Sequence, residues 1–232
     1  KMSLKKEVAD ICEESGTSIF GVTSTKNLED APEGHRPSDI MDDSESVIVI
    51  GLKMLDAQMD LQSTSDGYYT VSPRDDMMKG HITFISRELD RIGYKISRTL
   101  EQKGYKAYHQ LASEGGVDDR ELVGLFSIKH AAEEAGLGVI GQNSLLLTPE
   151  FGPRVRLTAI ITDAEIEADE ALEKEFCENC DNICIEACPA DAIKDPTDDS
   201  AYEIDKFACC NSLGSRVDCR GCLTECPVGK GN

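Results

Sequence analysis

Apolar residues recur at helical spacing in three stretches of the chain. The longest stretch covers residues 75–103 and is interrupted by Gly93; its apolar side consists of Ile82, Ile85, Leu89, Ile92, Ile96 and Leu100. A second stretch covers residues 4–14 and a third covers residues 126–135. The stretch at residues 4–14 carries Leu4, Val8, Ile11 and Cys12 on one side. Apolar residues at this period predict amphipathic helices whose apolar sides pack in a core.

Four short stretches are predicted to be strands. They cover residues 18–23, 47–52, 105–111 and 156–162. The second is apolar without a break, as expected for a strand buried on both faces. Residues 56–73 are polar with little periodicity, so we expect a loop or a mobile flap there. The alternation of helices and strands predicts an α/β (or α+β) domain in residues 1–165.

The composition changes after an acidic connector at residues 163–174. Nine of the ten cysteines lie in the last 56 residues, and seven of them form two runs that each end in Cys-Pro. The first run spaces its cysteines as C-x2-C-x3-C-x3-C-P and the second as C-x2-C-x3-C-P. Residues 166–232 are therefore expected to form a second, small domain.

Thiolates at these spacings are typical of iron–sulfur ligands. In two-cluster ferredoxins the last cysteine of each run binds the other cluster. On that pattern the first cluster is held by Cys177, Cys180, Cys184 and Cys226. The second is held by Cys188, Cys219, Cys222 and one of Cys209 or Cys210. The sequence thus predicts two [4Fe–4S] clusters, with one residue more than usual between the second and third cysteines of the first run.

Two other interpretations of the cysteines remain open. Paired C-x-x-C elements also form tetrahedral zinc sites, although zinc does not require the further cysteines at x3 spacing followed by proline. Disulfides are a weaker alternative, because we find no secretory signal and the cysteines are concentrated in one segment.

Acidic residues outnumber basic ones by 44 to 24, which gives a formal net charge of −20. Proteins that bind nucleic acids neutralise phosphates with Lys and Arg, so a nucleic-acid partner is not expected. A high charge also serves solubility alone. No apolar run approaches the ~20 residues of a membrane helix, and we expect a cytoplasmic protein without a membrane partner.

A glycine-rich segment joins the helix at 126–135 to the strand at 156–162. Its glycines suit either close backbone approach to a bulky ligand or tight turns. The G-x-G-x-x-G pattern at residues 136–141 is a weak indication of nucleotide binding, because a helix precedes it rather than a strand. Arg154 and Arg156 would share a face of the strand, either to hold an anionic group or as surface arginines.

This arrangement resembles the epoxyqueuosine reductase family. The matching residues are Ala135-Gly-Leu-Gly138, Gly141-x-Asn143, Leu-Leu, Pro149-Glu-x-Gly152, the following strand with Thr-Asp, and the two cysteine runs. The iron–sulfur modules of corrinoid-dependent reductive dehalogenases are similar. Glu33-Gly-His-Arg-Pro37, before the strand at 47–52, also matches the N-terminal half of the family. The resemblance covers nearly the whole chain.

The resemblance implies a nitroreductase-like domain that binds cobalamin, followed by a bacterial-type two-[4Fe–4S] ferredoxin module. The matching positions that would line the corrinoid are Gly138, Gly141, Gln142, Asn143, Ser144 and Leu145. The spacing from Asp205 to Cys209 follows the family, which favours Cys209 over Cys210 as the remaining ligand.

The family places an acidic proton donor in a Val-Asp segment upstream of Ala-Gly-Leu-Gly. Val117-Asp118 occupies a similar place here, although the intervening residues are longer and lack the family's Pro and Glu-Arg context. A general acid at Asp118 requires a pKa raised by burial. The alternative is a carboxylate on a surface loop.

The leading hypothesis is an iron–sulfur oxidoreductase, at work in an anaerobe or a reducing cell interior. Its two clusters pass low-potential electrons from an electron-donor protein to a bound corrinoid, which reduces a small molecule or another corrinoid. One alternative is a flavin (FMN) oxidoreductase on the same fold. Another is a ferredoxin-type electron carrier without an organic cofactor.

Overall fold

The structure, a computed structural model, describes residues 3–60, 73–113, 117–118, 122–178, 180–194, 204–215 and 220–230. The chain forms two compact units, each assembled from three segments. Unit 1 consists of Lys1–Leu52, Ile85–Gly138 and Arg156–Glu173. Unit 2 consists of Lys53–Phe84, Val139–Val155 and Lys174–Asn232. The division into residues 1–165 and 166–232 stays a prediction from the sequence.

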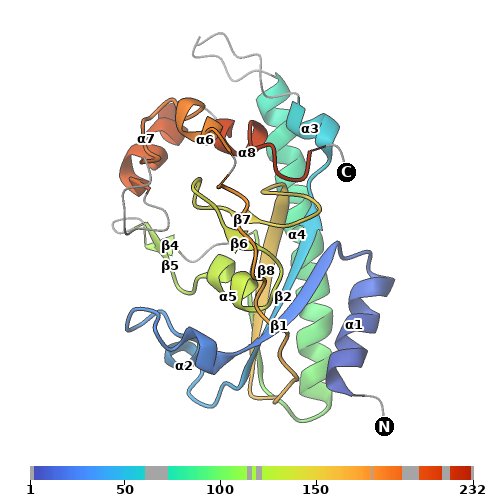
Figure 1. Cartoon of the computed structure of the whole chain (residues 1–232). Helices are drawn as coiled ribbons and strands as arrows, with labels where there is room; N and C mark the ends of the chain where they lie inside the picture. Colours follow the sequence, from blue (N-terminus) through green and yellow to red (C-terminus); the bar gives the residue numbers. More distant parts are fainter. Residues whose placement is uncertain are drawn as a thin grey trace. The chain divides into compact units, whose positions relative to one another are not determined.

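A four-stranded sheet with the order β1-β2-β8-β3 lies at the centre of unit 1 (Figure 1). Strand β1 (Ile19–Ser24) pairs antiparallel with β2 (Ser46–Lys53), and β3 (Ala107–Gln110) pairs antiparallel with β8 (Val155–Thr162). Residues 46–51 of β2 and 158–162 of β8 are buried, because these two strands occupy the middle of the sheet. The four predicted strands and the mixed α/β class are confirmed.

Helices cover both faces of this sheet. Helix α4 (Pro73–Gln102) runs along one face and α5 (Ile128–Glu134) lies on the other (Figure 1). The ion pair Lys95–Glu14 joins helix α1 (Leu4–Glu14) to α4, and Lys103–Glu7 joins α1 to the residue that follows α4. Cys12 of α1 is a core residue, as predicted, and burial raises the pKa of its thiol to about 11.

The buried side of α4 explains the glycine that interrupts it. Five of the six predicted stripe residues are buried: Ile85, Leu89, Ile92, Ile96 and Leu100. A Cβ at Gly93 would overlap the imidazole ring of His109 on β3. Gly93 therefore gives up helix propensity to make room for that ring.

Short elements connect these parts of unit 1. They are η1 (Thr25–Leu28), α2 (Pro37–Ile40) and the two-stranded sheet of β4 (Val117–Asp118) and β5 (Val123–Gly124). His35 Nδ1 donates a hydrogen bond to the Gly124 carbonyl at 2.9 Å. The segment Glu33–Pro37 thus lies beside the β4–β5 pair. The predicted break at Gly115 and Gly116 lies outside the described residues.

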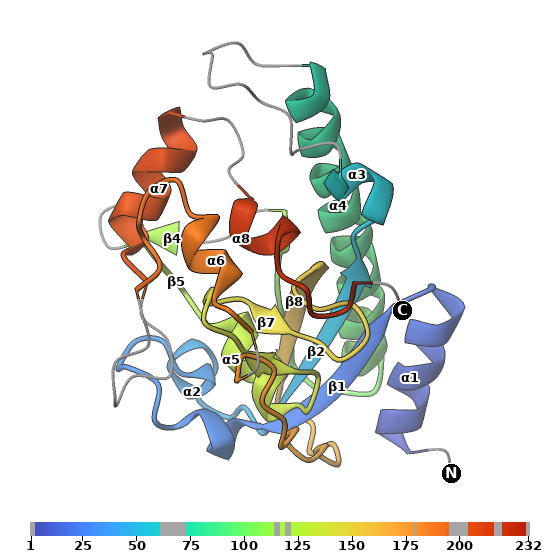
Figure 2. The ribbon, with the colours of Figure 1, turned by 45° about the horizontal axis from the view of Figure 1, so that its top comes forward.

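Unit 2 is built from short helices and one small hairpin. Its elements are α3 (Asp56–Asp60), β6 (Val139–Ile140), β7 (Leu146–Leu147), α6 (Ile183–Glu186), α7 (Lys206–Ser215) and α8 (Gly221–Thr224). Helices α6 and α8 lie side by side (Figure 2). A Cβ at Gly221 would clash with the Ala187 carbonyl.

Residues 56–60 form the short helix α3, so the loop predicted at 56–73 is wrong there. The rest of that loop, residues 61–72, lies outside the described residues. The acidic connector contains no helix or strand, as expected. In the part of the chain that the structure describes, no helix is long and apolar enough to cross a membrane.

Candidate functional site

Four cysteines line one pocket of unit 2, and they are the four predicted to hold the first cluster. The pocket has a volume of about 310 Å³, including the space at its mouth. Its walls are formed by Gln142, Asn143, Leu147, Phe176, Cys177, Cys180, Asn182, Cys184, Cys226, Pro227 and Val228. Cysteines of both runs thus line one pocket.

The first cysteine run folds into a turn followed by one helical turn. The Cys180 amide donates to the Cys177 carbonyl at 3.1 Å, and Asn182 then adopts the left-handed conformation with φ 51°. Asn tolerates this conformation better than most residues. It precedes α6, on which Cys184 lies. The extra residue between the second and third cysteines is thus absorbed in a left-handed turn.

The second run brings Cys226 to the same pocket. Both Cys184 and Cys226 are buried, with 8% and 6% of their surfaces exposed. Arg154 donates to the carbonyl groups of Val228 at 2.9 Å and of Cys226 at 2.6 Å. A long-range contact therefore fixes the turn that carries Cys226.

The pKa values of two thiols in this pocket reflect their burial and the charges close to them. Burial raises the pKa of Cys184 most, and together with the charges of Cys177, Cys180 and Cys226 it brings this pKa to about 11. Burial also raises the pKa of Cys226, while a backbone hydrogen bond from Val228 and the charge of Arg154 lower it. A metal that takes the place of the protons of Cys184 and Cys226 would offset the cost of deprotonating these two thiols.

The cysteines assigned to the second cluster are described in part. Cys188 Sγ accepts a hydrogen bond from the Ala192 amide at 3.3 Å, and Cys222 lies on α8. Cys209 is half-buried on α7, whereas the adjacent Cys210 is exposed. Cys219 lies outside the described residues. Cys209 thus remains the better candidate of the adjacent pair.

No disulfide joins any of the nine described cysteines. Within the described ranges, no three His, Cys, Asp or Glu side chains converge on a position for one metal ion. Cys177, Cys180 and Cys184 of the first run and Cys226 of the second line a pocket instead.

The residues predicted to line a corrinoid lie mostly at the tip of the β6–β7 hairpin. A turn closes there, with the Ser144 amide donating to the Gly141 carbonyl at 2.8 Å and Ser144 at φ 59°. A Cβ at Gly141 would overlap the Leu147 side chain. Leu145 is half-buried after the turn, and Gly138 is buried at the end of a segment of unit 1. Their role toward a corrinoid stays a prediction.

Two residues of this turn contact the cysteine segments. The Gln142 amide donates to Cys177 Sγ at 3.5 Å, and its side chain donates to the Lys194 carbonyl at 2.6 Å. Asn143 Nδ2 donates to the Cys222 carbonyl at 3.2 Å. The hairpin therefore braces both cysteine runs. The sequence did not predict this contact, and neither did it predict the role of Arg154.

Asp118 lies at the end of β4, where its backbone pairs with Val123. Residues 119–121 and the Asp118 side chain lie outside the described part of the structure. The contact between His35 and Gly124 places the Glu33–Pro37 motif beside this hairpin. The proton-donor role of Asp118 stays a prediction.

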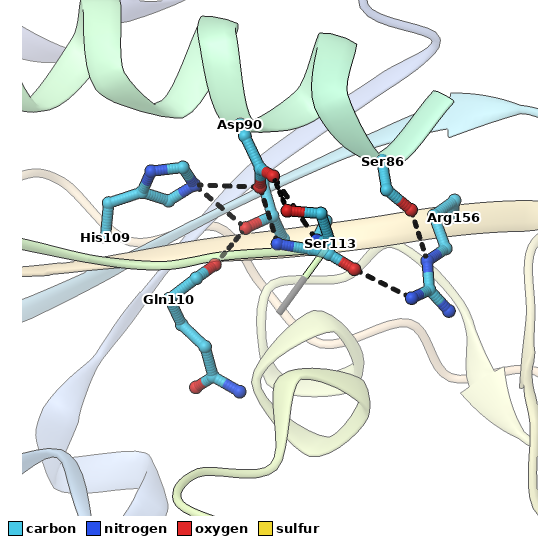
Figure 3. Close-up of polar contacts among 8 residues, drawn as sticks. Ser86, Asp90, His109, Gln110, Ser113 and Arg156 are labelled. Carbon is cyan, nitrogen blue, oxygen red and sulfur yellow. Dashed lines mark hydrogen bonds and ion pairs between the residues drawn. The ribbon is translucent and has the colours of Figure 1, made fainter. Parts of the chain in front are cut away.

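Unit 1 contains a polar network between α4 and the sheet (Figure 3). The Asp90 carboxylate accepts from the Ala112 amide at 2.6 Å and lies 4.0 Å from His109 Nε2. Because the Thr158 hydroxyl donates to the Gln110 carbonyl, it accepts from His109 Nε2 at 3.1 Å. Burial lowers the pKa of His109, and Asp90 partly opposes this.

Arg156 belongs to the same polar network. It donates to Ser86 Oγ at 3.2 Å and to the Ala112 carbonyl at 2.7 Å, and it keeps an exposed surface. Arg154 differs from it, because Arg154 precedes β8 and its guanidinium is occupied by backbone carbonyls. Of the two arginines considered for an anionic group, Arg156 is the one that offers an exposed surface.

These features define a mixed α/β protein with a cysteine-lined pocket, and known proteins resemble it in sequence and fold. No family model matches the chain. The epoxyqueuosine reductase of Bacillus subtilis is 31% identical over 137 residues, which are 53% of this chain and 33% of that protein. A tetrachloroethene reductive dehalogenase of Desulfitobacterium hafniense is 46% identical over 71 residues, which are 28% of this chain and 13% of that protein. The chain spans about a third of the Bacillus relative's length.

Solved structures share the fold over nearly the whole chain. A reductive dehalogenase structure linked to B12-dependent dehalogenation has a TM-score of 0.70 at 20% identity, covering 98% of this chain and 32% of that one. An epoxyqueuosine reductase with a tRNA stem loop has a TM-score of 0.65 at 18% identity, covering 98% of this chain and 66% of that one. The fold is thus the mixed α/β fold of these two groups of reductases. The chain is thus similar in sequence to epoxyqueuosine reductases over about half of its own length.

Proposed function

We propose that this protein is an iron–sulfur reductase that passes low-potential electrons through two [4Fe–4S] clusters to a bound corrinoid. One observation carries the proposal: Cys177, Cys180, Cys184 and Cys226 line a single pocket although up to 49 residues separate them. Two-cluster ferredoxins use the same crossed pattern of ligands. In this proposal residues 166–232 correspond to the ferredoxin module and residues 1–165 to a nitroreductase-like domain.

The donor set fits a cluster. Thiolates are the ligands that iron–sulfur clusters use, and an N–H group directed at a ligand sulfur, as from Gln142 to Cys177, is one of the factors that set their potential. The second cluster would be held by Cys188, Cys209, Cys219 and Cys222. The close approach of Gly221 to the Ala187 carbonyl supports this, because these two residues adjoin Cys222 and Cys188.

The corrinoid is proposed from the relatives. One structural neighbour concerns B12-dependent dehalogenation, and the residues that match the family's motif are Gly138, Gly141, Gln142, Asn143, Ser144 and Leu145. A corrinoid supplies a strongly reducing metal centre when bound. The chain's own residues would bind it, shield it from water and deliver a proton to the substrate.

Asp118 is the proposed proton donor. A solved Bacillus subtilis epoxyqueuosine reductase has a catalytic aspartate on a loop that swings out of its active site. Asp118 ends a two-residue strand beside His35, from the second segment that resembles the family. A carboxyl there must hold its proton near neutral pH and release it on reduction.

The substrate class has two candidates. A charge of −20 favours a small molecule, because phosphate backbones are bound through basic side chains. The second candidate is tRNA, since a solved epoxyqueuosine reductase was determined with a tRNA stem loop. Titration of the protein with such a stem loop at low and high salt distinguishes them: saturable binding that weakens with salt supports tRNA, and its absence supports a small molecule.

The decisive experiment is anaerobic purification followed by metal, sulfide and visible-spectrum analysis. We expect about eight iron and eight sulfide per chain, as two [4Fe–4S] clusters require. We also expect a corrinoid spectrum, either as purified or after cobalamin is added. Stoichiometric zinc, or iron near four, would exclude the two clusters. A flavin spectrum supports the FMN enzyme, and clusters without any organic cofactor support an electron carrier supplied by a donor protein.

A further inference from the structure

Arg154 is a buried cation whose described contacts are all with neutral groups. Only 4% of its surface is exposed. Its guanidinium donates to the carbonyl oxygens of Val228 at 2.9 Å, Cys226 at 2.6 Å and Thr224 at 3.5 Å. None of the ion pairs among the described residues includes Arg154. A buried charge is costly unless a counter-charge lies near it.

The backbone around Arg154 is interlocked with the turn that carries Cys226. Gly152 and Gly229 have φ values of 55° and 72°. A Cβ at Gly152 would overlap the Val228 carbonyl, and a Cβ at Gly229 would overlap the backbone of Phe151 and Gly152. The segments approach so closely that only glycine fits at either position. Arg154 is thus held rigidly against the Cys226 turn.

An iron–sulfur cluster in the pocket would supply the negative charge that is absent from the described contacts of Arg154. Four thiolates around a [4Fe–4S] core of 2+ leave a net charge of about −2 at the pocket. Cys226 and Val228, whose carbonyls Arg154 binds, both line that pocket. The guanidinium also acts electrostatically on the Cys226 thiol. A cation and a cluster at these positions would stabilise each other.

We propose that Arg154 is the counter-ion and the positioning residue of the cluster held by Cys177, Cys180, Cys184 and Cys226. It fixes the turn that delivers Cys226 from the second run, and it raises the reduction potential of that cluster, because a nearby positive charge favours the more negative reduced state. This role rests on the proposed function, since it requires a cluster in the pocket.

Three variants of the full chain test the proposal, each reconstituted anaerobically with iron and sulfide. Arg154→Met removes the charge and the hydrogen bonds, whereas Arg154→Lys keeps the charge but cannot reach three carbonyls in the same way. Lys230→Met is the matched control, because it removes one positive charge from an exposed side chain four residues after Cys226. The measurements are the midpoint potential by EPR-monitored titration and the rate of iron loss to a chelator.

We expect a lower midpoint potential in Arg154→Met for the EPR signal that Cys226→Ala abolishes. Arg154→Lys should stay near the parent in potential. Both variants should lose iron faster, by roughly 10- to 100-fold, as when partners of metal ligands are removed. Lys230→Met should match the parent in both measurements.

Unchanged potential and iron retention in a folded Arg154→Met protein overturn the proposal while leaving the clusters in place. If Arg154→Met does not fold, Arg154→Lys decides: iron retention equal to the parent overturns the positioning role. A parent that binds no cluster overturns both this proposal and the proposed function, and it is recognised by its iron content before any variant is measured.

Discussion

Gly93 and His109 depend on each other within the core of unit 1. The ring of His109 lies where a side chain on α4 would otherwise be, and its Nε2 is bound to Thr158. The side chain of His109 is only 9% exposed. Gly93, which interrupts the helical pattern in the sequence, therefore leaves the space that the buried imidazole of His109 occupies.

Gly93→Ala should destabilise unit 1. The added methyl group overlaps the His109 ring, and overpacking of this kind costs about 1–3 kcal/mol, against the ~1 kcal/mol that alanine contributes to helix propensity. The measurement is urea unfolding followed by far-UV circular dichroism. Gly80→Ala in the same helix is the control, because nothing lies within 4 Å of its Cβ. Gly80→Ala should stabilise, and equal effects of the two substitutions would contradict the packing argument.

His109 should make unit 1 less stable in acid. Burial lowers its pKa, so between the unfolded value near 6.5 and the lower folded value the unfolded chain binds more protons. Its contribution to stability is therefore present above pH ~6.5 and is lost as the pH falls below that value. We expect His109→Gln to show a shallower loss of stability between pH ~7 and ~5 in thermal unfolding. Identical pH dependence in parent and variant would refute this role.

At the scale of elements, the cysteine pocket is assembled from four pieces. The first run supplies a turn and α6, the second run supplies the turn after α8, the β6–β7 hairpin supplies Gln142 and Asn143, and the segment before β8 supplies Arg154. Each piece is too short to be stable alone. A ligand bound between them would therefore stabilise the whole arrangement.

Cys226→Ala should remove the cluster of the first run, although Cys226 lies in the second. Iron should fall from about eight to about four per chain, because one of two cubes loses a ligand. Cys210→Ala should leave iron unchanged, since Cys210 is exposed and Cys209 is the proposed ligand. Loss of iron in Cys210→Ala with retention in Cys209→Ala would reverse that choice. Iron analysis and EPR spectra of the remaining cluster give the readout.

Periodicity predicted the long elements, and ligand chemistry predicted the cysteines. The stripe of α4 and the unbroken run of β2 were identifiable because burial selects apolar residues at fixed spacing. Helix α3 was not predicted, because five mostly polar residues are too few to show apolar positions at helical spacing. The sequence did not predict the contacts that the cysteine segments make with Gln142, Asn143 and Arg154. Their contacts are with backbone carbonyls far away in the chain, and such contacts leave no pattern in a single sequence.

At the scale of the whole molecule, the net charge of −20 is the dominant property. Most of the ion pairs among the described residues involve side chains with substantial exposure, and such pairs are worth little in water. Excess negative charge repels itself and favours expanded states. Two clusters would add further negative charge.

Salt should therefore stabilise the protein. Raising the ionic strength from about 0.01 M to about 0.1 M shortens the Debye length from ~30 Å to ~10 Å and screens the repulsion. We expect the midpoint of thermal unfolding to rise with sodium chloride, and to rise equally with potassium chloride because the effect is not ion-specific. A midpoint that falls with either salt would show that attractive pairs dominate instead.

The discontinuous make-up of unit 2 restricts how its cysteine-rich part can be transplanted. A fragment cut at residue 174 would carry every cysteine except Cys12, yet it would lack the wall formed by Gln142, Asn143 and Leu147 and the Arg154 that holds the Cys226 turn. A graft into another reductase would need Val139–Val155 as well as the cysteine segments. The exchangeable module is thus defined by a loop far upstream as much as by the cysteines themselves.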